Sequence, residues 1–571
     1  MKIMITKNLI IPTLIFSLCF LSSTNLLKSD KSDITSPITA SIYYDYSTQK
    51  YNIVPFVLDT NAVAYATYTP TLYTDGWDKL AITTNNKFED NISAYAAGYL
   101  EGVLTNKHIH NHFLNVSADM WKETGKMPDN VREFFVKHRE YINNQYLLNK
   151  NDNYWKIAFA FQTQLEGLIQ GYNDEAAKNS LPTIDSIDFH NMASSGDIMD
   201  IIYYKNKEGR PNYSKMTYTE ILKHIRRSNH CSALIKISAD FKDLWFGHNT
   251  WWRYSSMTRI FKEYNFNFKD IIAKTNSVMF SSYPAAINSV DDFYVTNTDL
   301  AIMETTNSFF NNDLFDLLTP DSLLTWHRAM IANYLTNDSK SWTETFIINN
   351  SGTYNNQFMV LDLKLVDTEK QKVHDNALWI VEQIPGQTQS GDVTQMLRYG
   401  YWPSFNTPFF DNIKKLSLIP DTIDRDPMLI HTLDYDTCAR AEIFRRDEGK
   451  VTSLEEFKKL MRSNDYKHDY LSLNDPSFTI SAREELDSEK GDCEGAIDAK
   501  VASIHDIRGK ANKSVSIVQG PTYGDVPIFH WEESKFCKNT IRFGLSDRYA
   551  FEWIVYESGN NKGVDMLKFL N

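Results

Sequence analysis

The alternation of apolar and polar residues predicts strands near the start of the chain and helices after them. Residues 31–75 are rich in Ser, Thr, Tyr and β-branched residues, and the alternation over 51–57 is typical of a strand. From 92 to 114, small and apolar residues recur at helical spacing, and helical patterns also cover 129–148 and 154–172. The N-terminal part is therefore expected to contain strands followed by three helices.

The apolar pattern fades between residues 205 and 230. This stretch contains Gly209, Pro211, several Lys and Arg, and little apolar periodicity, which is typical of an exposed linker. Strands are predicted again directly after it, at 232–237 and 243–248, where they are joined by a short polar turn.

The rest of the chain predicts a mixture of elements. A helix is expected over 255–264, and strands such as 357–363 are separated by loops rich in Asn, Pro and Asp. The overall pattern indicates a chain of the α/β (α+β) class without internal repeats.

The N-terminus has the features of a cleavable signal peptide over 1–24. Lys2 and Lys7 precede an apolar run, 9–21, that ends in small polar residues. The run is shorter than the roughly 20 residues that a membrane-spanning helix needs, although an uncleaved anchor is the alternative. No later stretch is apolar enough to span a bilayer, so we expect a secreted or lysosomal protein.

Candidate glycosylation sites agree with this route. Asn-x-Ser/Thr sequons, which accept N-linked glycans in secreted proteins, occur at six positions. They are Asn91, Asn115, Asn212, Asn337, Asn349 and Asn512.

The charge balance excludes one class of partner. The formal net charge is −13, whereas nucleic-acid binding needs clustered Lys and Arg, so no nucleic-acid partner is expected. Protonation of all 14 His would move the charge from −13 to about +1. This shift would reduce self-repulsion in an acidic compartment.

Several common catalytic motifs are absent from the sequence. It has no G-x-S-x-G elbow, no Walker A loop and no H-E-x-x-H pair. His108 and His112 could share one helix turn as metal ligands, but no acidic third ligand lies nearby, so a solvated helix end is favoured. We therefore expect neither a metal ion nor a cofactor.

Cys231 is the strongest candidate nucleophile. It lies where the basic linker meets a predicted strand, as an N-terminal nucleophile requires. Its thiol could attack the carbonyl of His230, and hydrolysis of the resulting thioester would free the α-amino group. An amine with a pKa of about 7.7 to 8 can act as the base for its own thiol. The alternative from composition alone is a buried, inert cysteine.

Many segments around Cys231 resemble the phospholipase B-like family, also called the lamina ancestor family. The resemblance begins with Cys-Ser-Ala-Leu-Ile-Lys at 231–236 and Gly-His-Asn-Thr-Trp at 247–251. Ordered segments along nearly the whole mature chain share it, namely 98–102, 164–172, 196–200, 257–264, 281–284, 291–294, 303–306, 354–357, 382–386, 401–410, 441–446 and 495–498.

The resemblance implies a four-layer αββα N-terminal-nucleophile fold that processes itself. In that case 25–230 and 231–571 are two fragments of one folded unit. Cys231 matches the nucleophile, and His248 matches a pocket histidine that could bind the thiolate or substrate, with an ordinary sheet histidine as the alternative. Trp251 matches a wall of the pocket, or else a core tryptophan.

Further roles follow from the same resemblance. Asn406 matches a position that could supply an oxyanion-hole amide. Arg440, just before a predicted strand at 441–446, matches an arginine that could hold a carboxylate or phosphate, although Ala439 replaces the usual Pro of the family. Either Thr305 or Thr306 is expected near the same pocket.

The mature chain would keep four cysteines after loss of Cys19 with the signal peptide. Cys493 and Cys537 are plausible disulfide partners in an oxidising compartment. Cys438 would then be a free thiol, unless the pairing differs.

The expected function is that of a phospholipase B-like hydrolase that releases fatty acyl chains from glycerophospholipids through a Cys231 acyl-enzyme. The partner is then a phospholipid or another acylated small molecule. Two alternatives remain open: an amidase acting on N-acyl or peptide amides, and a lysosomal lipid-binding protein with a vestigial site.

Overall fold

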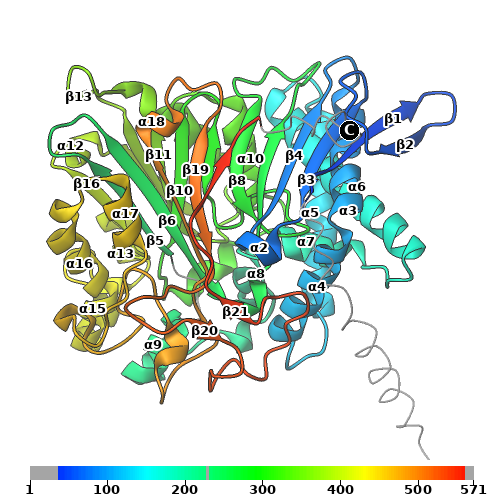
Figure 1. Cartoon of the computed structure of the whole chain (residues 1–571). Helices are drawn as coiled ribbons and strands as arrows, with labels where there is room; N and C mark the ends of the chain where they lie inside the picture. The colour runs from blue at the N-terminus through cyan, green and yellow to red at the C-terminus, as the bar shows by residue number, and fades with distance from the viewer. Residues whose placement is uncertain (1–35, 227–230, 560–571) are drawn as a thin grey trace, which may run out of the picture. The chain divides into compact units, whose positions relative to one another are not determined.

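The computed structural model describes residues 36–226 and 231–559, and two large β-sheets face each other within them (Figure 1). The expected signal peptide and His230 lie outside the described residues. The first sheet has eleven strands in the order β15-β14-β11-β10-β9-β8-β7-β4-β3-β1-β2, and its neighbours are antiparallel except β4 and β7. These strands are β1 (Ile38–Asp45), β2 (Lys50–Pro55), β3 (Ala64–Thr69), β4 (Asp78–Thr84), β7 (Ile260–Asn265), β8 (Ser277–Ser282), β9 (Tyr294–Thr296), β10 (Leu300–Thr306), β11 (Asn356–Asp362), β14 (Leu378–Ile384) and β15 (Gln387–Asp392).

The second sheet has the order β16-β5-β6-β18-β19-β22, and β17 also pairs with β6. Its strands are β5 (Cys231–Ile237), β6 (Leu244–Arg253), β16 (Tyr401–Ser404), β17 (Glu494–Ala496), β18 (Asp498–Ser503), β19 (Ser514–Gln519) and β22 (Ile554–Glu557). Two short ribbons complete the described strands, β12 (Val366–Asp367) with β13 (Lys372–Val373), and β20 (Phe529–His530) with β21 (Arg548–Tyr549).

Helices cover the outer face of each sheet. Figure 1 shows α3, α5 and α6 on one side of the molecule and α13, α16 and α17 on the other. The longer helices are α3 (Asp90–Leu104), α4 (Asn106–Met120), α5 (Asp129–Leu148), α6 (Asn153–Lys178), α7 (Ser186–Ala193), α8 (Ile198–Lys205), α9 (Tyr218–Arg226), α10 (Thr325–Leu335), α11 (Ser339–Phe346), α16 (Ala439–Asp447) and α17 (Leu454–Met461). The shorter ones are α2 (Leu72–Asp75), α12 (Thr394–Leu397), α13 (Asp411–Leu416), α14 (Ile419–Arg425), α15 (Ile430–Leu433) and α18 (Ile504–Ile507).

Side chains alternate in direction along each strand, and this explains how both sheets are buried on two faces. In β5, Ala233 and Ile235 enter the core between the sheets, whereas Leu234 enters the core under α16 and α17. In β10, Met303 faces the core between the sheets and Ile302 faces the helices over the first sheet. Successive strand residues point to opposite faces, so each strand contributes to two cores. The four-layer αββα prediction is confirmed.

Close packing of α3 on α6 depends on glycine. A Cβ on Gly98 would lie 1.8 Å from the main-chain oxygen of Gln164, and one on Gly102 would lie 2.2 Å from that of Leu168. These two α3 glycines therefore let the helix backbones meet directly. None of the described helices is long and apolar enough to cross a membrane.

Most of the predicted elements are present. β1, β2 and β3 occupy the strand-rich entry, α5 covers the predicted 129–148, and α6 contains 154–172. The helical pattern over 92–114 belongs to two helices, α3 and α4, which meet at Thr105.

Two predicted element types were wrong. The helix expected over 255–264 is a single 3₁₀ turn, Tyr254–Ser256, followed by β7, because Ile260 and Tyr264 face the helices and Phe261 faces the second sheet. That alternation is the period of a strand. The strand expected at 441–446 is part of α16.

The prediction of an exposed linker over 205–230 was wrong for residues 218–226. Residues Tyr218–Arg226 form α9, whose Ile221, Leu222 and Ile225 are buried. Their spacing of three and four residues is that of one helix face. Among the described residues of this stretch, the exposed part lies before α9, where Lys207, Glu208 and Gly209 are exposed.

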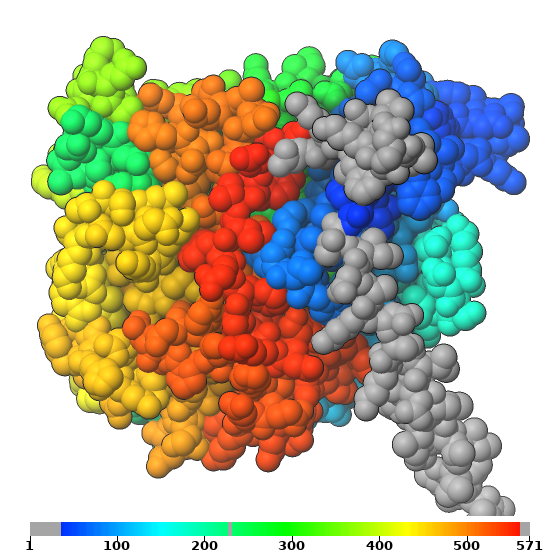
Figure 2. Space-filling view, viewed as in Figure 1, coloured from blue at the N-terminus to red at the C-terminus, as the bar shows by residue number. Residues whose placement is uncertain are grey.

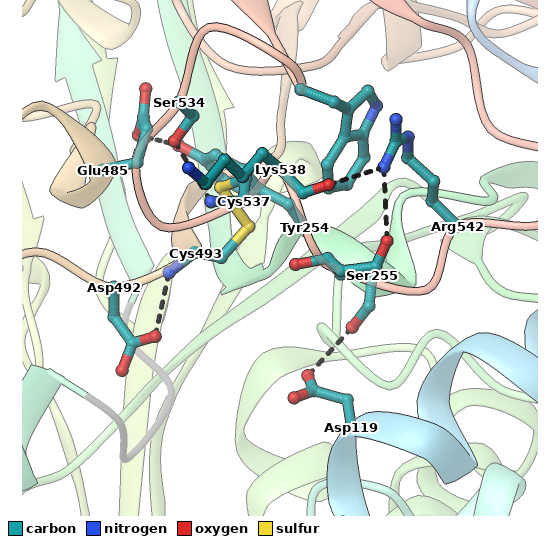
Figure 3. The surroundings of a disulfide bond; sticks show 12 residues. Asp119, Tyr254, Ser255, Glu485, Asp492, Cys493, Ser534, Cys537, Lys538 and Arg542 are labelled. Atoms are coloured by element: carbon teal, nitrogen blue, oxygen red, sulfur yellow. Dashed lines mark hydrogen bonds between the residues drawn. A yellow bond between two sulfur atoms is a disulfide. The ribbon is translucent and has the colours of Figure 1, made fainter.

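The predicted Cys493–Cys537 disulfide is present, and Cys438 is a buried free thiol. Figure 3 shows the disulfide beside Tyr254, whose hydroxyl donates to Glu485 over 2.7 Å. The bridge fixes the loop that follows β20 against the start of β17. In the space-filling view, the C-terminal residues (red) lie beside the N-terminal part of the sandwich (blue) (Figure 2).

One sequon is inconsistent with this arrangement. Asn115 is fully buried, and its side chain makes two hydrogen bonds with the main chain of Phe543. A glycan on this amide would have no space and would break both bonds. The sequon residues Asn212, Asn337 and Asn512 are exposed, and Asn91 and Asn349 are half-buried.

Candidate active site

Cys231 is the first residue of β5, in the second sheet between β16 and β6. Its side chain is buried, with 3% of the residue exposed. The main-chain nitrogen donates to Asn406 Oδ1 over 3.1 Å, and the main-chain oxygen accepts from Arg440 Nη1 over 2.6 Å. Both polar groups of the residue's backbone are therefore held by side chains that sequence reasoning had singled out.

Asn406 follows β16 and links the two sheets. Its φ of 73° is in the left-handed region, which Asn adopts more readily than most residues. Its Nδ2 donates to the Thr306 main-chain oxygen over 2.7 Å, and its main-chain N–H donates to Thr305 Oγ1 over 3.3 Å. The end of β10 thus positions the side chain that holds the Cys231 nitrogen.

The two threonines have different surroundings. Thr305 is fully buried, and its hydroxyl lies 2.6 Å from that of Ser404. Thr306 is half-buried and lines a cavity next to the site. Of the two candidates, Thr306 therefore contacts the cavity and Thr305 supports the Asn406 loop.

Arg440 lies in the first turn of α16 and is directed at the nucleophile. Besides the Cys231 oxygen, its guanidinium donates to the Phe405 main-chain oxygen over 2.7 Å. It also lies over the Trp251 ring, 4.5 Å from its centroid. Burial lowers the pKa of Arg440 to about 10. In this state the guanidinium binds backbone carbonyls and positions Cys231, and its expected role in holding a substrate carboxylate or phosphate stays a prediction.

Helix α9, which precedes the nucleophile in the chain, lies beside Trp251 and Arg440. Leu222, Ile225 and Arg226 of α9 line a small cavity of about 30 Å³ together with Trp251 and Arg440. The Arg226 guanidinium forms an ion pair with Asp475, which anchors the end of α9.

The thiol of Cys231 lies in a cluster with His248 and Glu304. One candidate ligand atom from each of the three lies within 4.8 Å of the others, and Sγ is 4.0 Å from Glu304 Oε1. Burial raises the pKa of the Cys231 thiol well above its usual value, and the Glu304 carboxyl adds to this rise. The thiol is therefore protonated in this state and needs a base to become a nucleophile.

The other two members of the cluster are neutral for the same reason. Burial lowers the pKa of His248 well below its usual value, and Lys500 contributes. Burial, with Asp292 next in effect, raises the pKa of the Glu304 carboxyl well above its usual value. The Glu304 Oε1 also lies 3.0 Å from the Tyr354 hydroxyl. Thiol, imidazole and carboxylate are ligand types that zinc accepts, so these side chains could also hold a metal ion.

A buried ionic network supports the cluster and was missed by sequence reasoning. Asp291 Oδ2 accepts from Arg259, Lys500 and the Thr250 hydroxyl over 2.7 to 2.9 Å. Thr250 is the strand partner of Cys231, so the network fixes the strand beside the nucleophile. Charged residues within apolar strands, such as Lys500 in β18, are the sequence signal that could have revealed it.

The histidines of α4 contact separate partners. His108, His110 and His112 are buried, which corrects the expectation of a solvated helix end. The His108 ring pairs with Asp78 over 3.2 Å, His110 contacts the Tyr172 hydroxyl, and His112 stacks on Tyr283. The three rings thus have separate partners.

Comparison with known proteins identifies the family. The model of a family described as phospholipase B matches residues 64–556. The chain is 38% identical over 507 residues to phospholipase B-like protein B of Dictyostelium discoideum, which covers 87% of this chain and 86% of that protein. It is 36% identical over 526 residues to phospholipase B-like 1 of Bos taurus, covering 90% and 93%, and 34% identical over 526 residues to phospholipase B of Crotalus adamanteus, covering 90% and 92%.

Among solved structures, a mutant of the conjugated bile acid hydrolase from Clostridium perfringens matches with a TM-score of 0.25 and 10% identity, covering 50% of this chain and 89% of that one. At this similarity the αββα assignment rests on the sheets and cores described above. The sequence matches extend over most of the chain and of its relatives. The chain therefore belongs to the phospholipase B family and is a hydrolase.

Proposed function

We propose that this chain is a phospholipase that releases fatty acyl chains from glycerophospholipids, with Cys231 as an N-terminal nucleophile that it exposes by cutting its own backbone. The observation that carries the proposal is the surroundings of Cys231. Its backbone nitrogen is held by Asn406, its backbone oxygen by Arg440, and its thiol lies 4.0 Å from the Glu304 carboxyl.

Self-cleavage would proceed through an acyl shift from nitrogen to sulfur. The Cys231 thiol adds to the carbonyl carbon of His230, the C–N bond breaks, and the proton passes to the leaving nitrogen. Water then cleaves the thioester, which leaves a carboxylate on His230 and a free thiol and amine on Cys231. Arg440 and Asn406 would keep the strand in place while the bond before it breaks.

The same groups would then act on substrate. The freed α-amino group, with a pKa of about 8 in its unperturbed state, accepts the thiol proton, and sulfur adds to the ester carbonyl carbon. The alcohol leaves with that proton, and water hydrolyses the acyl-enzyme to free fatty acid. Asn406 Oδ1 would hold the amine, and the second Nδ2 hydrogen, which is not donated to Thr306, could face the oxyanion.

The burial of Cys231 supports the proposal that the site becomes active when the chain is cut before Cys231 and α9 moves away. Cys231 is almost completely buried, and α9 lines the space in front of Trp251 and Arg440. Cutting at 230–231 would release the C-terminal end of α9. We infer that this happens in a secretory or lysosomal compartment, in line with the signal-like N-terminus.

Self-cleavage is tested with purified chains at mildly acidic pH, followed by intact mass. The wild-type chain should yield a fragment that begins at Cys231, Cys231→Ala should stay whole, and Cys231→Ser should be cut more slowly because a hydroxyl is the weaker nucleophile. Cys438→Ala is the matched control, since it removes the other buried free thiol of the described residues. Cleavage of purified Cys231→Ala at the same bond would refute the mechanism.

Substrate class is tested with the processed protein. Free fatty acid should appear from phosphatidylcholine micelles with wild type and not with Cys231→Ala. Equal release from both would identify a contaminant. Cleavage of N-acyl amides without any cleavage of lipid would favour the amidase, and binding of lipid without turnover would favour a binding protein.

A further inference from the structure

A second cavity lies beside the nucleophile, at the end of β10. It has a volume of about 330 Å³, within the range of about 300 to 1,000 Å³ that is usual for small-molecule sites. Thr306 and Tyr354 belong to its wall. Thr306 accepts the hydrogen bond of Asn406, and Tyr354 contacts Glu304, so the cavity adjoins both the residue that holds Cys231 and the cluster around its thiol.

Aromatic rings form much of the wall. They come from α8, from the segment before α9 and from the loop after β10, and they are Tyr203, Tyr213, Phe309, Phe310 and Phe315. Several are in contact with one another: Tyr203 lies 5.4 Å from Phe315, and Tyr213 lies 5.2 Å from Phe310, between ring centroids. The faces of such rings attract cations.

One carboxyl lies in the same wall without a cationic partner. Asp200 Oδ2 accepts from the Tyr354 main-chain nitrogen over 2.8 Å and from Asn355 Nδ2 over 3.3 Å. Among the described residues, Asp200 forms no ion pair. Burial raises the pKa of Asp200 to about 7, and the nearby Asp197 adds to the rise. A carboxyl in this state would gain from a cation placed beside it.

Two of the other polar side chains in the cavity wall have partners within the protein, and a third has no hydrogen-bond partner among the described residues. The Arg253 guanidinium pairs with Asp119 over 2.9 Å, and the His224 ring contacts the Tyr213 hydroxyl. Asn307 is 5% exposed, and neither polar atom of its amide has a hydrogen-bond partner among the described residues. An acyl chain in this cavity would leave Asp200 and Asn307 against hydrocarbon, which is unfavourable. An anion in this cavity would lie beside the Asp200 carboxyl, which is also unfavourable.

We propose that this cavity binds the substituted ammonium group of a phospholipid headgroup, a proposal that rests on the proposed phospholipase function. Asp200 would supply the negative charge, and the rings of Tyr203, Tyr213 and Phe315 would surround the cation. The ester bonds of the same lipid would then lie toward Cys231. Choline and ethanolamine headgroups share the required chemistry.

Binding can be measured without catalysis in the full-length Cys231→Ala chain, which keeps the cavity as described. Isothermal titration calorimetry would use choline, ethanolamine and the neutral analogue of choline in which a carbon atom replaces nitrogen. Choline or ethanolamine should bind, and the neutral analogue should bind at least about tenfold more weakly. Tighter binding of choline would identify the quaternary headgroup, and similar binding of both would identify an ammonium site common to the two lipids.

Substitutions in the wall separate charge from shape. Asp200→Asn should weaken choline binding by about tenfold or more, because it removes the charge and keeps an oxygen for Tyr354. Tyr203→Leu should weaken it and Tyr203→Phe should not, since only the ring is needed. Asp188→Asn is the matched control, because Asp188 also has a raised pKa but lies on α7, outside the cavity.

The outcomes distinguish this proposal from the proposed function. Choline binding that depends on Asp200 in a protein without esterase activity would support the ammonium site and refute the phospholipase. Equal affinity for choline and its neutral analogue would overturn the proposal. So would unchanged choline affinity in both Asp200→Asn and Tyr203→Leu, each checked for a native circular dichroism spectrum.

Discussion

Replacement of Asn406 tests how the nucleophile is held. The side chain joins the Cys231 nitrogen to the Thr306 oxygen, and its backbone is in the left-handed region. Asn406→Ala would leave both of these buried groups without their partner, at about 1 to 3 kcal/mol each. Alanine in a left-handed conformation adds about 1 to 2 kcal/mol. Water that enters the vacated space can partner one of the groups, so we expect a loss of about 3 kcal/mol, near the lower end of the combined range.

Two further substitutions divide this loss into its parts. Asn406→Gly removes the same hydrogen bonds but tolerates the positive φ, so it should be about 1 kcal/mol less harmful than Asn406→Ala. Asn406→Asp keeps an oxygen for the Cys231 nitrogen and loses the donor to Thr306. Its self-cleavage should therefore be slowed less than that of Asn406→Ala.

Stability and cleavage need separate assays. Urea unfolding at pH 5, in the Cys231→Ala background, measures the change in free energy without processing. Intact mass over time, in the Cys231 background, measures the cleavage rate. If Asn406→Ala unfolds at the parent's urea concentration and cuts at the parent's rate, then Asn406 does not position the nucleophile and the reasoning fails.

Three other perturbations follow from the structure. Burial raises the pKa of the Asp197 carboxyl to about 6, above its unfolded value near 4, so this group costs stability as pH rises; between pH 5 and pH 8 the loss in urea unfolding should be about 1.4 kcal/mol smaller in Asp197→Asn than in wild type. Gly98→Ala should lower the melting temperature by at least several degrees because its Cβ would lie 1.8 Å from a main-chain oxygen of α6, whereas Gly449→Ala, with open space around it, should not. The Cys493–Cys537 bridge joins residues 44 apart, so the double variant Cys493→Ser/Cys537→Ser should be less stable by about 4 kcal/mol. Free thiols at both positions in non-reducing peptide maps of wild type would contradict the bridge.

Local patterns predicted the elements that depend on local forces. Long amphipathic helices such as α5 and α6, and the strand pair β5 and β6, are evident because one apolar face recurs over many residues. The errors occurred where tertiary contacts determine the secondary structure of a segment. β7 is buried on both faces and pairs with the distant β4, and its Ile260 and Tyr264, four residues apart, also match one face of a helix. α9 was hidden by the charged residues on its exposed face.

The candidate site was predictable only in part, because it is assembled from distant strands. Cys231, Asn406 and Arg440 do meet, but only the resemblance to a family linked them, since no spacing rule joins residues so far apart in sequence. Glu304 was missed although its segment was noticed. A carboxyl within an apolar strand indicates burial, but its partner 73 residues away cannot be found from periodicity.

Histidine protonation does not account for the predicted preference for acid. Protonation of all 14 His was expected to suit the chain to acid, but burial lowers the pKa of His112 and His138 to about 3, and that of His248 well below its usual value. These imidazoles would stay neutral near pH 5. Two buried carboxyls respond in that range instead, because the raised pKa values of Glu304 and, while no cation lies beside it, Asp200 leave both groups uncharged in acid. Raising the pH toward and beyond neutrality would force uncompensated charge into the walls around the nucleophile, at a cost in stability. The predicted preference for an acidic medium therefore rests on the carboxyls around the site, not on the number of histidines.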